Sequence, residues 1–137
     1  MIHGVMAHSG IRYSRIIRMI RVTLKSIVIG AVLLMLIDLP WLYINQSWAS
    51  KMIRGIQGSA MKVRFLPAIL VYVFMAYILL IPKSYGEAFL MGAAVYGVYD
   101  ATNYATLDKY CPVFAVADTL WGGVLLSSAW WVRKNYF

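Results

Sequence analysis

Four runs of hydrophobic residues, separated by shorter polar segments, dominate the pattern along this chain. They cover residues 22–44, 65–81, 87–107 and 113–132. At a rise of 1.5 Å per residue, about 20 helical residues cross the ~30 Å hydrocarbon core of a bilayer. The pattern therefore predicts an all-α polytopic membrane protein with four transmembrane helices.

Prolines, glycines and polar residues mark the ends of these runs. Pro40 is expected to kink the first helix near its far end, and Pro82 to end the second. The connections are residues 45–64, 83–86 and 108–112. The first connection mixes basic and apolar residues, which predicts a short interfacial helix broken around Gly55 and Gly58. Small residues that let the third and fourth helices pack closely are Gly92, Gly97, Gly122 and Gly123.

Residues 11–25 carry a different pattern, in which basic and apolar positions alternate with helical spacing. At about 100° per residue, the basic side chains fall on one side of a helix and the apolar ones on the other. The basic residues are Arg12, Arg15, Arg18, Arg21 and Lys25. Such a helix can lie among lipid headgroups and contact their phosphates, and a basic collar on the first membrane helix fits equally well. We expect residues 1–21 to form a basic amphipathic tail and residues 22–134 to form the transmembrane domain.

Composition and charge agree with a membrane protein. The 137 residues are 62% hydrophobic and 13% charged, with a mean hydropathy of +0.71, whereas soluble domains carry about 25% charged residues. The net charge of +8 arises from residues at the ends of the hydrophobic runs. This distribution favours anionic lipid headgroups as partners and predicts no nucleic acid. His3, His8 and the single Cys111 form no metal-ligand motif, so we predict neither a metal nor a cofactor.

The distribution of basic residues also predicts an orientation. With four spans, both termini share one side of the membrane. That side carries Arg12, Arg15, Arg18, Arg21, Lys25, Lys83, Arg133 and Lys134. The other side carries Lys51, Arg54, Lys62, Arg64 and Lys109. Because basic residues concentrate on the cytoplasmic side, we expect both termini in the cytoplasm.

Three aspartates lie inside the hydrophobic runs, where a charge costs a few kcal/mol. Asp38 and Asp100 come near the ends of the first and third runs, and Asp118 near the start of the fourth. Alternating spans place all three at one depth in the non-cytoplasmic half. Trp41 and Trp121 each follow an aspartate by three residues, so ring and carboxylate share a helix face. The candidate intramembrane polar cluster comprises Asp38, Trp41, Asp100, Asn103, Thr106, Asp118 and Trp121.

Two interpretations of this cluster remain open. Its side chains can hold the helices together through hydrogen bonds worth ~1 kcal/mol each, which a small bundle needs, and we favour this role. Alternatively, the aspartates form a proton, cation or substrate site. An intramembrane aspartyl protease would carry Gly-x-Gly-Asp at its second aspartate, whereas Val116 and Ala117 precede Asp118. We therefore predict that the protein is not an enzyme.

Two segments resemble the signature of a family of small bacterial membrane proteins of unknown function, with relatives in large DNA viruses. YDATNYATL at 99–107 and VADTLWG at 116–122 are similar to its Tyr-Asp-x-Thr-Asn-x-Ala-Thr-Leu and Asp-x-x-Trp-Gly elements. The DLPW segment at 38–41 is similar to an earlier Asp-x-x-Trp element. The resemblance covers about residues 32–132 and implies a four-helix integral membrane protein without an assigned activity. The typical member lacks the basic N-terminal extension.

These observations favour a non-enzymatic structural component of a membrane or membrane-containing assembly, with the inner membrane of a virion as one setting. Its expected partners are the bilayer, other membrane or capsid proteins, and further copies of itself. The alternative is a small oligomeric transporter or channel that moves protons or cations through Asp38, Asp100 and Asp118.

Overall fold

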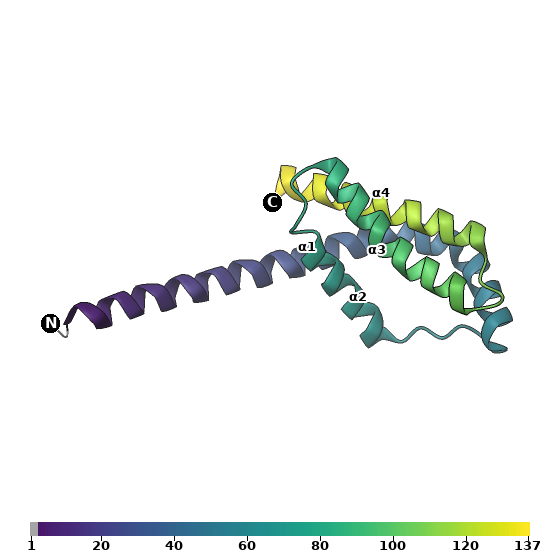
Figure 1. The fold of residues 1–137 in the computed structure, drawn as a ribbon, viewed down its shortest axis with the longest axis horizontal. Helices are drawn as coiled ribbons and strands as arrows, with labels where there is room; N and C mark the ends of the chain where they lie inside the picture. Colours follow the sequence, from purple (N-terminus) through teal and green to yellow (C-terminus); the bar gives the residue numbers. More distant parts are fainter. Residues whose placement is uncertain (1–2) are drawn as a thin grey trace.

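Four α-helices form the part of the chain that the structure describes. The computed structural model describes the backbone of residues 3–137 and the side chains of Ile17, Met19, Arg21 and residues 23–137. The helices are α1 (His3–Gln57), α2 (Phe65–Ile78), α3 (Tyr85–Thr106) and α4 (Pro112–Tyr136) (Figure 1). The predicted all-α fold is confirmed.

Successive helices run in opposite directions. α2 packs against α1, and α4 packs against both α1 and α3. Gly30 of α1 faces Ala76 of α2, while Asp38, two turns further along α1, faces Tyr72 of α2. This reversed order shows that α1 and α2 are antiparallel. In Figure 1 the N-terminal part of α1 continues alone beyond the other three helices.

Glycines bring α3 and α4 into close contact. A Cβ atom at Gly92 would lie 2.7 Å from Leu126 Cβ and would also overlap the backbone of Gly122. A Cβ atom at Gly122 would in turn overlap the ring of Tyr96. The prediction that these glycines allow close packing of the third and fourth helices is confirmed.

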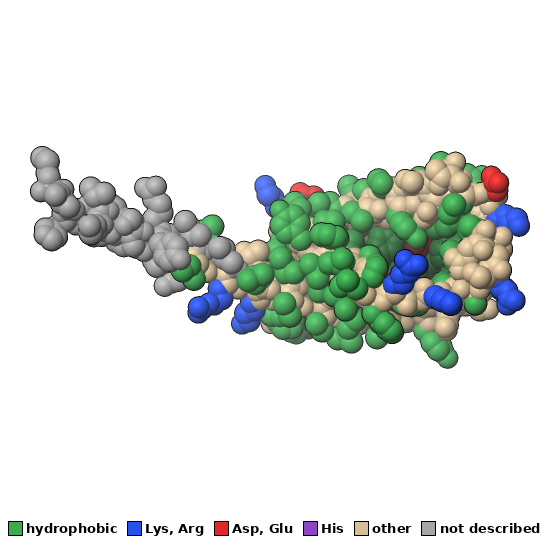
Figure 2. All heavy atoms as spheres, turned by 90° about the horizontal axis from the view of Figure 1, so that it is seen from below, with side chains coloured by type: hydrophobic (Ala, Val, Ile, Leu, Met, Phe, Trp, Pro, Cys, Tyr) green, Lys and Arg blue, Asp and Glu red, His purple; other side chains and the backbone are tan. Residues whose placement is uncertain are grey.

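The bundle buries a small core and leaves a large hydrophobic surface. The core comprises Leu34, Met75, Ala76, Leu79, Leu125, Leu126 and Ala129. On α2 alone, the exposed large hydrophobic residues are Phe65, Leu66, Ile69, Leu70, Val71, Phe74 and Tyr77. Figure 2 shows a broad band of hydrophobic side chains between basic side chains toward both ends of the bundle. Soluble monomers rarely expose such a continuous apolar surface, so lipid is the expected solvent.

Two of the helices are long and apolar enough to cross a membrane. These stretches are Thr23–Gln57 in α1 and Pro112–Tyr136 in α4. α2 is apolar but has only 14 residues, which corresponds to about 21 Å of helix.

The course of α1 differs from the prediction. We expected the first span to end at residue 44 and a separate interfacial helix to break around Gly55 and Gly58. Instead one helix of 55 residues runs through the predicted tail, the first span, Pro40 and Gly55. It ends at Gln57, and Gly58 follows with φ 75°. A glycine in the left-handed region is a frequent helix C-terminus, because it lacks the Cβ that disfavours this conformation.

Tertiary contacts explain why α1 continues past the first span. Trp48 lies edge-on against Phe114 at the start of α4, with ring centroids 5.2 Å apart. The backbone N–H of Cys111 donates a hydrogen bond of 3.3 Å to Met52 Sδ. These contacts hold residues 45–57 as helix against the α3–α4 turn, which the local sequence pattern alone did not reveal.

The remaining bounds shift by a few residues. α2 ends at Ile78 and not at residue 81, and α4 extends to Tyr136 and not to residue 132. Of the predicted headgroup contacts, Arg21 and Lys25 are exposed on α1. The side chains of Arg12, Arg15 and Arg18 lie outside the described residues.

Candidate functional site

Two Asp-x-x-Trp segments face each other across the α1–α4 contact. Trp41 Nε1 of α1 donates a hydrogen bond of 2.8 Å to Asp118 Oδ1 of α4. In return, Trp121 Nε1 of α4 donates a hydrogen bond of 2.7 Å to Asp38 Oδ1 of α1. Each aspartate therefore accepts from the tryptophan of the other segment. We call these four residues the Trp–Asp clasp.

The two indole rings of the clasp also contact each other directly. The ring centroids of Trp41 and Trp121 are 5.0 Å apart, and the ring planes differ by 6°. Stacked aromatic pairs contribute about 0.5–1.5 kcal/mol beyond the area they bury. A buried indole N–H needs an acceptor, and here each finds a carboxylate. The clasp thus combines ring packing with two hydrogen bonds at one helix crossing.

α2 joins the clasp through a single side chain. Tyr72 Oη donates a hydrogen bond of 2.9 Å to Asp38 Oδ2. Asp38 is 4% exposed, and each of its two oxygens accepts one hydrogen bond. This carboxylate therefore connects α1, α2 and α4.

A second buried carboxylate, Asp100, connects α3 to the α3–α4 turn and to α4. Tyr110 Oη, from the α3–α4 turn, donates a hydrogen bond of 2.7 Å to Asp100 Oδ1. Thr119 Oγ1 of α4 donates one of 3.3 Å to Asp100 Oδ2. Burial of the phenol, with the Asp100 carboxylate beside it, raises the pKa of Tyr110 above its ordinary value. Tyr110 therefore stays protonated at neutral pH and remains a donor.

Thr119, which donates to Asp100, lies inside the Asp118–Trp121 segment of the clasp. It therefore joins the Asp100 site to the clasp. Tyr96 of α3 packs over Gly122, the residue that follows Trp121. α3 is therefore held against the clasp both by the Asp100–Thr119 hydrogen bond and by this aromatic contact.

Five of the seven predicted cluster residues meet as described, and the other two, Asn103 and Thr106, contribute no hydrogen bond to the carboxylates. Thr106 is exposed, and its hydroxyl donates to the Thr102 carbonyl oxygen of its own helix at 2.7 Å. Asn103 is half-buried on α3, with its side chain near that of Tyr110, the donor to Asp100. Among the described residues, neither side chain bonds to any of the three carboxylates. Helical spacing placed both residues near Asp100 but did not determine which partner each side chain would reach.

Three residues of the network were not predicted from the sequence: Tyr72, Tyr110 and Thr119. Tyr72 lies in an uncharged apolar run and Tyr110 in a turn. A tyrosine that is buried in an apolar environment needs a partner for its hydroxyl, and this was the one signal available for Tyr72. The pattern gave no means of choosing Asp38 as that partner.

A cavity of about 200 Å³ borders the clasp on the side of the α3–α4 turn. Its lining includes Trp41, Asn45, Tyr99, Phe114 and Asp118. Asp118 is half-buried, and among the described residues only its Oδ1 accepts a hydrogen bond. It is thus the one carboxylate of the three that retains an oxygen for another partner.

The described residues contain no group of three or more His, Cys, Asp or Glu side chains placed to hold a metal ion. The described network is built from aromatic and hydroxyl donors that surround carboxylate acceptors.

Comparison with known protein families gives a match over most of the chain. Residues 23–133 match a family model described as "Predicted membrane protein (DUF2177)". No curated protein and no solved structure matches the chain. The matched residues contain the clasp, the Asp100 site and all of α2 and α3, and they begin after the first 22 residues.

Proposed function

Because this chain belongs to the DUF2177 family of predicted membrane proteins, we propose that it is a non-enzymatic structural protein of a membrane. In this proposal its intramembrane aspartates are hydrogen-bond acceptors that hold the helices together. The observation that carries the proposal is the Trp–Asp clasp, in which two carboxylates are bound by tryptophan donors from the opposite helix.

The wider network supports this role. Asp38 connects α1, α2 and α4, and Asp100 connects α3, the α3–α4 turn and α4. Together the two carboxylates reach every helix of the bundle. Interhelical hydrogen bonds in membranes contribute about 0.6 kcal/mol on average and up to about 2 kcal/mol. Several of them are needed to fix the arrangement of four helices, since lipid supplies no hydrophobic drive for helices to associate.

We further propose that all four helices cross the membrane. α2 lies antiparallel along the apolar stretch of α1, and α3 lies antiparallel along α4. If α1 and α4 span the bilayer, their partners occupy the same depth. The exposed apolar face of α2 supports contact with lipid. Its 14 helical residues fall short of a ~30 Å hydrocarbon core, a mismatch that local thinning can accommodate.

The N-terminal part of α1 completes the proposed role. It precedes the family match and continues alone beyond the bundle (Figure 1). With both termini in the cytoplasm, its basic residues would meet anionic headgroups or a partner protein of the surrounding assembly.

Substitution of the clasp aspartates tests the proposal. Asn at position 38 or 118 keeps an acceptor for the indole N–H but cannot ionise. We expect Asp38→Asn and Asp118→Asn to retain a near wild-type free energy of unfolding. Asp38→Ala and Asp118→Ala leave an indole without an acceptor and should each cost about 1–3 kcal/mol. Thermal unfolding in detergent compares the stability of the Asn and Ala variants with that of the wild type.

Thr106→Ala is the matched control, because the Thr106 hydroxyl bonds only within its own helix. It should leave the unfolding midpoint unchanged. Asn variants as unstable as the Ala variants would contradict the structural role.

The cavity beside Asp118 favours one alternative, a proton- or cation-linked transporter. The half-buried Asp118 carboxylate borders this cavity and has one oxygen that accepts no hydrogen bond from the described residues. In reconstituted vesicles a transporter would show proton or cation flux that Asp118→Asn abolishes without loss of stability. The structural proposal expects no flux above that of protein-free vesicles.

A further inference from the structure

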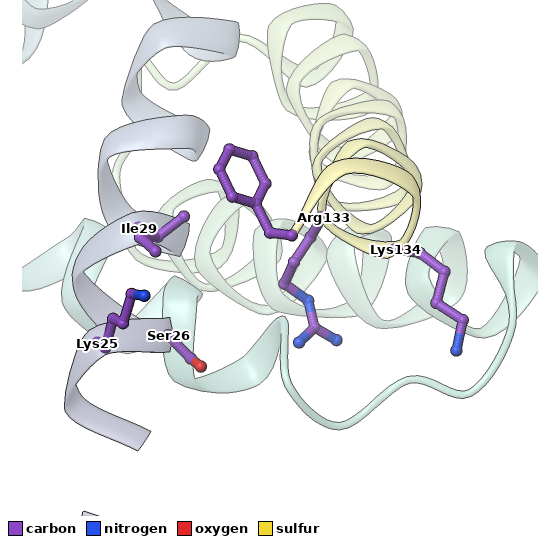
Figure 3. A pocket seen from close by; sticks show the side chains of 6 residues that line it. Lys25, Ser26, Ile29, Arg133 and Lys134 are labelled. Atoms are coloured by element: carbon purple, nitrogen blue, oxygen red, sulfur yellow. The ribbon is translucent and has the colours of Figure 1, made fainter. Parts of the chain in front are cut away.

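A basic groove lies between α1 and α4 at the end of the bundle where the N-terminal part of α1 departs. Its volume is about 470 Å³. Its lining residues are Lys25, Ser26 and Ile29 of α1, with Arg133, Lys134 and Phe137 at the end of α4. Figure 3 shows Ser26 and Arg133 extending toward the gap between the two helices. Three of the six lining side chains are basic and none is acidic.

The guanidinium group of Arg133 has unused hydrogen-bonding capacity. Its Nε is buried and has no hydrogen-bond partner among the described residues. A buried N–H without an acceptor is unfavourable, so a ligand that supplies an acceptor is stabilised there. Arginine binds phosphate oxygens through two parallel N–H donors, and a nearby hydroxyl such as that of Ser26 adds a third.

The apolar part of the groove distinguishes a lipid from a free anion. Ile29 and Phe137 line the groove together with the basic residues. Leu24 and Val28, which flank it on α1, are 58% and 63% exposed. The groove thus lies at the edge of the apolar surface of α1, where a phospholipid places its phosphate above its acyl chains.

We propose that this groove binds the phosphate of an anionic phospholipid, with Arg133 and Lys25 as its principal contacts. Basic pockets between membrane helices on the cytoplasmic side bind anionic headgroups in this way. The inference rests on the proposed membrane orientation of α1 and α4, but not on the role assigned to the aspartates. It adds the end of α4 to the headgroup contacts predicted for the N-terminal segment.

Lipid retention by the full chain tests the site. The protein is placed in nanodiscs of phosphatidylcholine containing a small fraction of phosphatidylglycerol, and binding is measured by competition with a fluorescent phosphatidylglycerol. Each basic contact near a membrane is worth ~1 kcal/mol, so Lys25→Gln with Arg133→Gln should weaken binding about tenfold or more. The matched control is Lys51→Gln with Arg54→Gln, which removes the same charge at the opposite end of α1. It should weaken binding by less than about twofold.

A second variant separates a shaped site from general attraction to positive charge. Ile29→Trp fills the groove and leaves the net charge unchanged, so it should also abolish the preferential binding. Equal binding by Ile29→Trp and wild type would overturn the proposal, as would equal losses in the two double variants. Displacement of the lipid by millimolar inorganic phosphate would identify a free-anion site instead.

Melting temperatures of the same samples show whether each variant folds, and if the double variant does not, Ile29→Trp and Lys25→Gln alone decide the outcome. Asp118→Asn should bind phosphatidylglycerol like wild type. Failure of the lipid site therefore leaves the unfolding results for the clasp unaffected.

Discussion

Asp38 and Asp118 each have a tryptophan three residues further along their own helix, yet each accepts its hydrogen bond from the tryptophan of the other segment. The antiparallel course of α1 and α4 explains this exchange. It places Trp41 opposite Asp118 and Trp121 opposite Asp38, and the two indole rings stack on each other. The Asp-x-x-Trp pattern therefore occurs once on each of two antiparallel helices and forms a reciprocal pair of hydrogen bonds.

The Asp-x-x-Trp spacing allowed part of this contact to be predicted. Three residues along a helix bring ring and carboxylate to one face, and alternating spans bring Asp38 and Asp118 to one depth. The donors that complete the network were not predictable, because Tyr72 and Tyr110 come from other parts of the chain. A tyrosine in an apolar run carries no local sign of the acceptor that its hydroxyl will reach.

Exchange of indole for phenyl tests the combined contribution of the hydrogen bonds and the indole stacking in the clasp. Trp41→Phe and Trp121→Phe each remove an N–H donor and keep an aromatic ring, and each should lower the free energy of unfolding by about 1–3 kcal/mol. Because both residues belong to one stacked network, the double variant should deviate from additivity by about 0.5 kcal/mol or more. Unfolding in detergent with a chemical denaturant measures the free energy of unfolding of the wild type, the two single variants and the double variant.

Trp131→Phe is the control for these tryptophan variants, because the Trp131 ring is half-exposed at the far end of α4. Its effect should stay within about 0.5 kcal/mol. Strict additivity of the two clasp substitutions would show that the two tryptophans act independently.

Among the elements, α1 departs furthest from its sequence pattern. The pattern placed a boundary near residue 44 because polar residues begin there, but polar residues do not in themselves end a helix. Contacts of Trp48 and Met52 with the start of α4 and the α3–α4 turn continue it to Gln57. Gly55 does not break the helix, whereas Gly58, with its positive φ, follows its end.

Glycine substitutions test the α3–α4 contact. Gly92→Ala would place a methyl group against Leu126 and the backbone of Gly122, which cannot move without separating the helices. We expect a loss of about 1–3 kcal/mol in the free energy of unfolding, as for other overpacked sites. Gly86→Ala, also in α3, meets no atom within 4 Å and should be neutral or stabilising by up to about 1 kcal/mol. Equal stability of the two variants would contradict the close approach.

In the whole molecule, the proposed structural network and the proposed lipid site lie toward opposite ends of the bundle. The clasp, the Asp100 site and the cavity lie in the half of the bundle that contains the α3–α4 turn, and the basic groove lies at the end with the C-terminus. The family match covers the bundle and not the first 22 residues. The four hydrophobic runs each correspond to one helix of the bundle, and α1 and α4 contain the stretches that are long and apolar enough to cross a membrane. In the proposed four-span arrangement, α2 and α3 take their depth in the membrane from their packing against α1 and α4.

The side of the membrane on which the α2–α3 turn lies tests the four-span arrangement most directly. In a Cys111→Ser background, single cysteines are introduced by Ser59→Cys, Lys83→Cys and Lys109→Cys, all at exposed positions in connections between helices. A membrane-impermeant thiol reagent is then applied from each side of sealed vesicles. We predict that Cys at 59 and 109 react from one side and Cys at 83 from the other. Reaction of all three from the same side would show that only α1 and α4 cross, and would contradict the account.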